Sequence, residues 1–133
     1  MDKTLQALRE ALALYRGSAN MDRQQRYDAV VSLAEWQLFS VQHLAQLSGL
    51  SKQTIYPWVP VPKRGLGGNF NPLSLDTLIQ LRENANNSLP VSDMLIGIAL
   101  DSGNSQLVVS RLTGLSQSTI SRRKHDNNSS GVQ

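Results

Sequence analysis

Residues 47–55, LSGLSKQTI, return almost unchanged 65 positions later as residues 112–120, LTGLSQSTI, in a chain of 133 residues. Six of the nine letters match. Each copy has a Gly that can end a helix in a tight turn, and two positions later a Ser that can cap the next helix. The repeat therefore predicts two pairs of helices, each joined by a short turn.

The similarity extends upstream of this phrase. Residues 27–36, YDAVVSLAEW, align with residues 92–101, SDMLIGIALD, at the same offset of 65. Both segments have apolar residues at the spacing of one helical face. These are Val30, Val31, Leu33 and Ala34 in the first copy, and Leu95, Ile96, Ile98 and Ala99 in the second. With Ser40 and Ser105 as caps of the next helix, the chain is predicted to be all-α, with a trihelical unit duplicated at offset 65.

The residue types around the turn resemble one family. Ala45 supplies a small side chain where two helices cross, Gly49 can adopt φ > 0, and Ile55 is a branched apolar residue for the second helix. The second copy has Ser110, Gly114 and Ile120 at these positions. The pattern is similar to the helix-turn-helix of bacterial and phage DNA-binding regulators, over about twenty residues in each copy. The resemblance implies two small DNA-binding domains.

The rest of the chain suggests how these domains are joined. We expect residues 1–60 to hold an N-terminal helix and the first helix-turn-helix domain, and residues 91–125 to hold the second. Residues 61–90 are expected to form a basic Pro/Gly linker followed by a connecting helix capped by Ser74, and residues 126–133 a disordered tail. The N-terminal helix carries an apolar stripe that either packs on its own domain or mediates dimerisation. The stripe consists of Leu5, Leu8, Leu12 and Tyr15.

Composition narrows the class of protein. The chain has no Cys, and His43 and His125 lie far apart, so we expect no metal, no cofactor and no disulfide. The longest apolar run, residues 94–100, is too short to cross a membrane, and acids near the start argue against a signal peptide. No nucleophile motif, phosphate loop or cleft-forming pair of acids is present, so we do not expect an enzyme. These observations favour a cytoplasmic protein, nucleoid-associated, or in the host cytoplasm if phage-encoded.

The distribution of charge is more informative than the net charge of +3. No acid occurs between Glu35 and Asp76, or between Asp101 and Asp126, and each acid-free window covers one copy of the phrase. Two positive surfaces could meet a polyanion, although basic residues near a chain end are often only solvated. The windows contain Lys52, Lys63, Arg64, Arg111, Arg122, Arg123 and Lys124.

The candidate DNA-binding residues follow from the resemblance. The letters that differ between the copies are expected on the exposed face of the third helix, where Gln can pair with adenine and Arg with guanine. In the first copy the candidates are Ser51, Lys52, Gln53, Thr54 and Tyr56, followed by Lys63 and Arg64. In the second copy they are Ser116, Gln117, Ser118, Thr119, Ser121, Arg122, Arg123 and Lys124.

The copies differ at three places. Pro57 should stop the first reading helix near Tyr56, because proline clashes with a helix interior. Lys63 and Arg64 then lie in a Pro/Gly-rich arm that either enters a minor groove or serves as a plain linker. Arg123 stands where the first copy has Trp58, so either that helix is less deeply seated or Arg123 snorkels. The run of Arg122, Arg123 and Lys124 is expected to contact phosphates as well as bases, although Arg123 and Lys124 could instead only complement the helix dipole.

The leading hypothesis is a sequence-specific, double-stranded DNA-binding regulator, and its small size resembles that of phage immunity repressors. As monomer or homodimer, it would read an operator with two different recognition helices, with no small-molecule effector evident. A recombination directionality factor or a transposition DNA-binding factor is the neighbouring alternative. A small helical protein-interaction module is the alternative from another class, and it would lack strong salt dependence of DNA binding.

Overall fold

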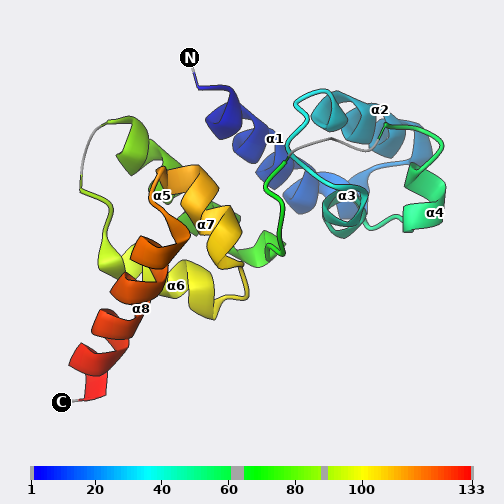
Figure 1. Cartoon of the computed structure of the whole chain (residues 1–133). Helices are drawn as coiled ribbons and strands as arrows, with labels where there is room; N and C mark the ends of the chain where they lie inside the picture. Colours follow the sequence, from blue (N-terminus) through cyan, green and yellow to red (C-terminus); the bar gives the residue numbers. More distant parts are fainter. Residues whose placement is uncertain (1, 61–64, 88–89, 133) are drawn as a thin grey trace. The chain divides into compact units, whose positions relative to one another are not determined.

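The computed structural model describes residues 2–60, 65–87 and 90–132, and side-chain surroundings as far as Lys124. Over these ranges the chain is all-α, as the sequence predicts, with helices only (Figure 1). It forms two compact units that divide between Gly67 and Gly68. Unit 1 contains α1 (Lys3–Gly17), the 3-10 helix Ser18–Asn20, α2 (Arg23–Ala34), α3 (Val41–Ser48) and α4 (Lys52–Ile55). Unit 2 contains the 3-10 helix Pro72–Ser74, α5 (Leu75–Asn86), α6 (Asp93–Asp101), α7 (Gln106–Thr113) and α8 (Gln117–Val132).

In both units the third α-helix packs against the other three. In unit 1, α3 packs against α1, α2 and α4, and in unit 2, α7 packs against α5, α6 and α8. The helix α5 is therefore part of the second unit, whereas the sequence analysis assigned it to the linker. The described end of the connecting segment packs on unit 1. Leu66 is buried in unit 1, and its N–H donates to the Leu38 carbonyl at 2.9 Å.

Helix α1 packs on its own unit through a different face from the predicted stripe. Leu8 is fully buried as expected, but Leu5, Leu12 and Tyr15 are only half-buried. The other buried residues of α1 are Ala7, Ala11 and Leu14. Small Ala side chains let another helix approach closely, which moves the buried face toward them. Glu10 ties α1 to α2, since it accepts from Trp36 Nε1 at 2.6 Å and from Ser32 Oγ at 2.9 Å.

The first helices of the two copies correspond at an offset of 66, not 65. At the predicted offset Leu33 falls on Ile98, yet Leu33 is fully buried and Ile98 is 44% exposed. The buried residues Val30, Leu33 and Ala34 instead match Ile96, Ala99 and Leu100 (96 − 30 = 66). The caps Ser40 and Ser105 keep the offset of 65, so the connection before the second helix is one residue shorter in unit 2.

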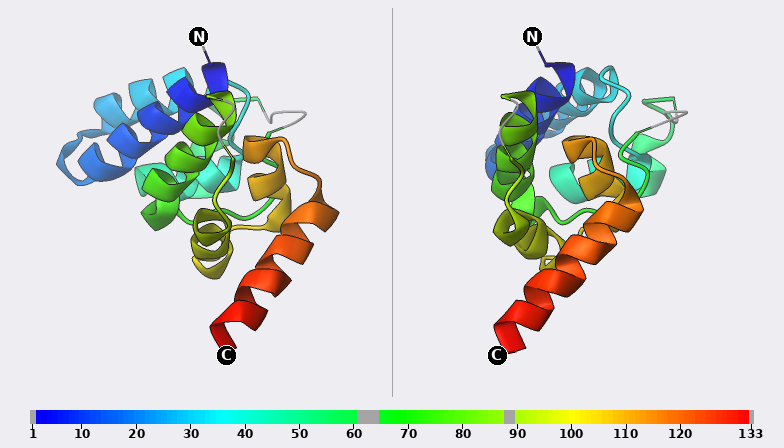
Figure 2. Two further views of the ribbon diagram at one scale, coloured as in Figure 1. Left: turned by 90° about the vertical axis from the view of Figure 1, so that its left-hand side faces the viewer. Right: turned by 60° about the vertical axis from the view of Figure 1, so that its left-hand side comes forward.

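Two helix ends test the sequence expectations directly. Helix α4 ends at Ile55, followed by Tyr56 as C-cap, which confirms the stop predicted from Pro57. Helix α8 continues through Val132, although the tail was expected to be disordered (Figure 2). Residues 121–130 contain neither Pro nor Gly, so no strong helix breaker interrupts α8.

The start of α5 differs from the expected cap. Ser74 does not cap α5 with its side chain, because its Oγ donates to the Asn71 carbonyl at 2.7 Å.

The turn glycine of unit 2 gives a test of backbone strain. Gly114 has φ 78°, and a Cβ added there would meet nothing within 4 Å. Gly114→Ala should therefore lower the free energy of unfolding by about 1–2 kcal/mol through the left-handed backbone alone. Gly17→Ala is the control with the opposite sign. Gly17 has φ −97°, which Ala tolerates, so loss of unfolded-state entropy should stabilise the protein by about 0.4–1 kcal/mol. Urea unfolding measures both, and a neutral Gly114→Ala would contradict the strain argument.

Candidate functional site

The α3–α4 and α7–α8 segments have the same turn geometry. Gly49 (φ 75°, ψ 10°) ends α3 and Gly114 (φ 78°, ψ 2°) ends α7, both in the left-handed region. Ser51 Oγ accepts from the Thr54 N–H at 3.3 Å, and Ser116 Oγ accepts from the Thr119 N–H at 3.2 Å. The repeated Gly and Ser therefore end one helix and begin the next in both units.

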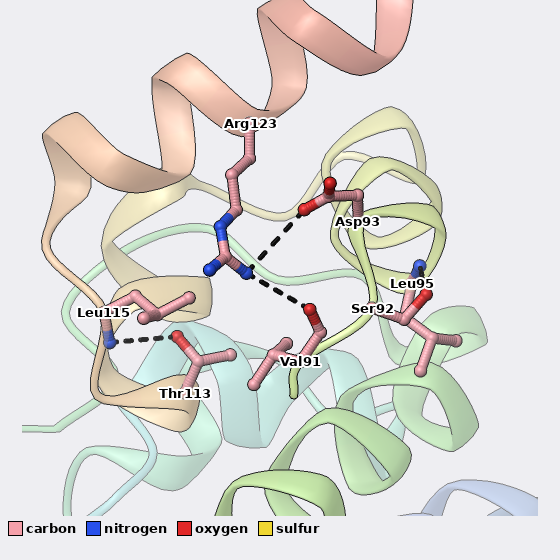
Figure 3. Close-up of polar contacts among 7 residues, drawn as sticks. All are labelled: Val91, Ser92, Asp93, Leu95, Thr113, Leu115 and Arg123. Carbon is pink, nitrogen blue, oxygen red and sulfur yellow. Dashed lines mark hydrogen bonds and ion pairs between the residues drawn. The ribbon is translucent and has the colours of Figure 1, made fainter. Parts of the chain in front are cut away.

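The phrase also keeps a hydroxyl before each turn glycine, where one copy has Ser48 and the other Thr113. Ser48 Oγ donates to the Leu44 carbonyl at 2.7 Å and accepts from the Leu50 N–H at 3.2 Å. Thr113 Oγ1 donates to the Val109 carbonyl at 2.8 Å and accepts from the Leu115 N–H at 3.2 Å. Figure 3 shows the contact between Thr113 and Leu115. The difference between Ser and Thr is therefore neutral for hydrogen bonding.

The described candidate residues of the first copy lie in α4 or at its two caps. Ser51, Lys52 and Gln53 are exposed, Tyr56 is 54% exposed, and Thr54 is half-buried. Ser51 and Thr54 share a hydrogen bond of 2.8 Å between their hydroxyls, so these two side chains hold the start of the helix. The side chains of Lys52, Gln53 and Tyr56 are left facing solvent. Lys63 and Arg64 lie outside the described residues.

The candidate residues of the second copy lie on the first two turns of α8. Gln117, Ser118, Ser121 and Arg122 are exposed. Arg122 makes no hydrogen bond or ion pair with the part of the chain that the structure describes. The other hydroxyls belong to the helix start, because Ser116 Oγ lies 2.8 Å from Thr119 Oγ1 and 3.1 Å from Ser118 Oγ.

Arg123 and Lys124 point back to their own unit. Arg123 Nη1 donates to the Val91 carbonyl at 3.1 Å and lies 3.7 Å from Asp93 Oδ1 (Figure 3). Lys124 Nζ lies 4.0 Å from Asp101 Oδ1. The partners of both residues lie in α6 or directly before it, so these two cations join α8 to that part of the unit. The sequence analysis considered phosphate contact for the same residues but did not identify these internal partners.

The Arg123 contact replaces an aromatic pair of unit 1. There, Trp58 packs edge-to-face on Tyr27 with ring centroids 5.0 Å apart. Arg123 stands 65 positions after Trp58, and Asp93 stands 66 positions after Tyr27, which are the offsets found for the corresponding helices. An apolar contact in one unit is thus an ion pair in the other. This explains a cation at a position that is apolar in the first copy.

Two cations near α4 were missed by the sequence analysis. Arg23 and Arg26 of α2 line a pocket of about 280 Å³ together with Met21, Leu50 and Thr54. These arginines lie outside the acid-free windows, because Asp22 and Asp28 flank them. Their spacing of three on one helix was the available signal, since it places both side chains on one face.

Comparison with known proteins identifies no relative from which the role of the site could be inferred. No protein-family model, curated protein or solved structure matches this chain. Within residues 2–60, 65–87 and 90–132, no helix is long and apolar enough to cross a membrane. The same described residues contain no group of three or more His, Asp or Glu side chains arranged to hold a metal ion. What remains is a set of exposed polar and basic side chains on two capped helices.

Proposed function

We propose that the chain is a sequence-specific, double-stranded DNA-binding regulator, with α3–α4 and α7–α8 as its two helix-turn-helix segments. One observation carries the proposal: the shared apolar residues at the two ends of the phrase are buried, while two of its three differing positions are exposed. Leu47, Leu112, Ile55 and Ile120 have no exposed surface. The differing pairs Lys52/Gln117 and Gln53/Ser118 are exposed. A fold alone requires only the first group, whereas a reader of two different sequences requires the second.

The exposed side chains have the chemistry of base recognition. Gln can form two hydrogen bonds with adenine, Arg two with guanine, and Ser one with several bases. Arg122 is the strongest candidate, because it is exposed and free of partners in the described chain. Since α4 is four residues long, unit 1 presents a short reading surface, and α8 presents a longer one.

Repression is the most specific form of this proposal. Two tandem binding units resemble those of phage immunity repressors, which would occlude a promoter by binding to it. A recombination or transposition factor would use the same surfaces. An interaction module is favoured by a different observation, since Met94 and Ile98 lie one turn apart on α6 and are 68% and 44% exposed.

Selection of tight-binding duplexes from a random pool tests the proposal. An enriched, asymmetric site in two parts would support one monomer reading with both helices, and a palindrome would indicate a dimer dominated by one unit. Pools without enrichment would contradict sequence-specific binding and favour the interaction module. The affinity should also fall steeply with added salt, because phosphate contacts release counterions.

Arg122→Ala should weaken binding to the selected site by about 1–3 kcal/mol and relax the preference at one or two base pairs. Arg111→Ala is a matched control, because it removes one positive charge from the exposed surface of α7 in the same unit. Titration of both variants on the selected and on a scrambled duplex measures the effect. Equal weakening on the two duplexes would assign Arg122 to phosphate and contradict its role in reading bases.

A further inference from the structure

A basic pocket lies beside α4 in unit 1, and its two arginines lie outside the repeated phrase. Its volume is about 280 Å³, and it is lined by Arg23 and Arg26 from α2, Met21 before α2, Leu50 from the turn, and Thr54 from α4. Arg23 and Arg26 are separated by three positions, so both extend from the same side of α2. Two arginines therefore line one depression that Thr54 of α4 also borders.

The Arg26 side chain has an unsatisfied hydrogen-bond donor. Its Nε atom is buried and has no hydrogen-bond partner. Its Nη1 lies against the turn, 3.8 Å from the position that a Cβ on Gly49 would occupy. A buried donor without an acceptor is costly and rare in folded proteins, and for a charged group the cost is greater. Arg26 therefore lines the pocket with a guanidinium group whose hydrogen-bond donors the described chain does not fully satisfy.

No nearby acid supplies that acceptor in the described chain. Asp22 caps α2 by accepting from the Gln25 N–H at 2.8 Å, and Asp28 accepts from Gln24 Nε2 at 3.0 Å. Neither carboxylate forms an ion pair with Arg23 or Arg26 within the described residues. The charged groups that line the pocket are both cations, which suits an anion with several oxygen atoms.

We propose that this pocket binds a phosphodiester group of the DNA backbone, with Arg26 and Arg23 as its ligands. The inference rests on the proposed function and specifies a contact that it does not include. Lys52 and Gln53 are exposed on α4, which borders the pocket through Thr54. A phosphate held here would fix the position of α4 on the duplex without reading its sequence.

Unit 2 has no equivalent pair of arginines. The position of Arg26 corresponds to Val91 at an offset of 65 or to Ser92 at 66. The Val91 carbonyl already accepts from Arg123. The phosphate contact therefore belongs to unit 1 alone, which has the shorter reading helix. In this arrangement unit 1 anchors the protein on the backbone, and unit 2 supplies most of the base contacts.

The test compares Arg26→Ala, Arg23→Ala and the control Arg9→Ala, which removes one charge from α1 outside the pocket. Binding of each full-length variant to the selected and the scrambled duplex is titrated at several salt concentrations. Loss of a charged hydrogen bond should weaken Arg26→Ala about tenfold or more on both duplexes. The slope of log K against log salt should also become about one unit shallower. Arg23 is exposed, so Arg23→Ala tests the pocket even if Arg26→Ala fails to fold.

Duplexes with one neutral methylphosphonate at each backbone position identify the phosphate. We expect one position at which neutralisation weakens the wild-type protein but not Arg26→Ala or Arg23→Ala. Wild-type affinity and slope in both variants, with DNA binding intact, would overturn the pocket and leave the proposed function standing. Failure of the wild-type protein to bind any duplex would overturn the proposed function itself. Binding of inorganic phosphate as tight as that of the selected duplex, and lost in Arg26→Ala and Arg23→Ala, would overturn DNA as the ligand.

Discussion

Asn104→Ala is expected to lower the free energy of unfolding of unit 2 by about 2–4 kcal/mol, because it breaks a buried hydrogen-bond network. Asn104 is 4% exposed, and its Oδ1 accepts from the Asn71 N–H at 2.8 Å. Its Nδ2 donates to Ser74 Oγ at 2.8 Å and to the Ala99 carbonyl at 2.7 Å. One side chain thus joins the segment before α5 to the end of α6. Alanine would leave several of these groups without a partner.

The control for Asn104 is Asn86→Ala, at an exposed residue at the end of α5. It should change stability by less than about 0.5 kcal/mol. Three measurements assign the loss of stability to one unit. Both tryptophans, Trp36 and Trp58, belong to unit 1, so their fluorescence follows that unit, whereas far-UV circular dichroism follows both. Hydrogen exchange of the amides of α5–α7 measures unit 2 directly. A loss below about 1 kcal/mol would mean that water replaces the amide.

Ile120→Ala is the second large effect, with an expected loss of about 2–5 kcal/mol in stability. Ile120 is the last residue of the repeated phrase and has no exposed surface, so truncation leaves a cavity under α8. Because α8 carries the proposed base-reading residues, loss of the packing that holds α8 in place should also weaken binding to the selected duplex. Urea unfolding and DNA titration measure the two effects.

A control of the same residue type exists in the same unit. Ile98 on α6 is 44% exposed, so Ile98→Ala should cost less than about 1 kcal/mol and leave DNA binding unchanged. Similar losses at Ile98 and Ile120 would contradict the burial that distinguishes them. Weaker DNA binding by Ile98→Ala would show that the exposed face of α6 takes part in the complex.

Local features of the fold were predictable because they depend on neighbouring residues. Ser40 and Ser51 cap helices by accepting from N–H groups three positions ahead, and Gly49 adopts the left-handed backbone that it tolerates best. Pro57 stops α4 through its own ring. The exposure of Lys52 and Gln117 follows from their places directly after the capping serines, at the first positions of α4 and α8.

Contacts between distant residues were less predictable. The face that α1 buries depends on how α1 packs against α2 and α3, and helical spacing alone does not show this. The register of α6 depends on a connection one residue shorter than its counterpart, because each residue turns a helix by about 100°. The role of Arg123 and the pocket at Arg26 depend on atoms that lie far away in the chain.

The sequence by itself determined the all-α class, the two matching turns, their caps and the stop after α4. These follow from backbone preferences and hydrogen bonds that span only a few residues. Only the tertiary structure decided that α5 belongs to unit 2, that Arg123 faces Val91 and Asp93, and that Arg23 and Arg26 line one pocket. Packing of whole helices sets these relations, because a side chain's partners depend on the rotation of its helix and on the face presented by the helix beside it.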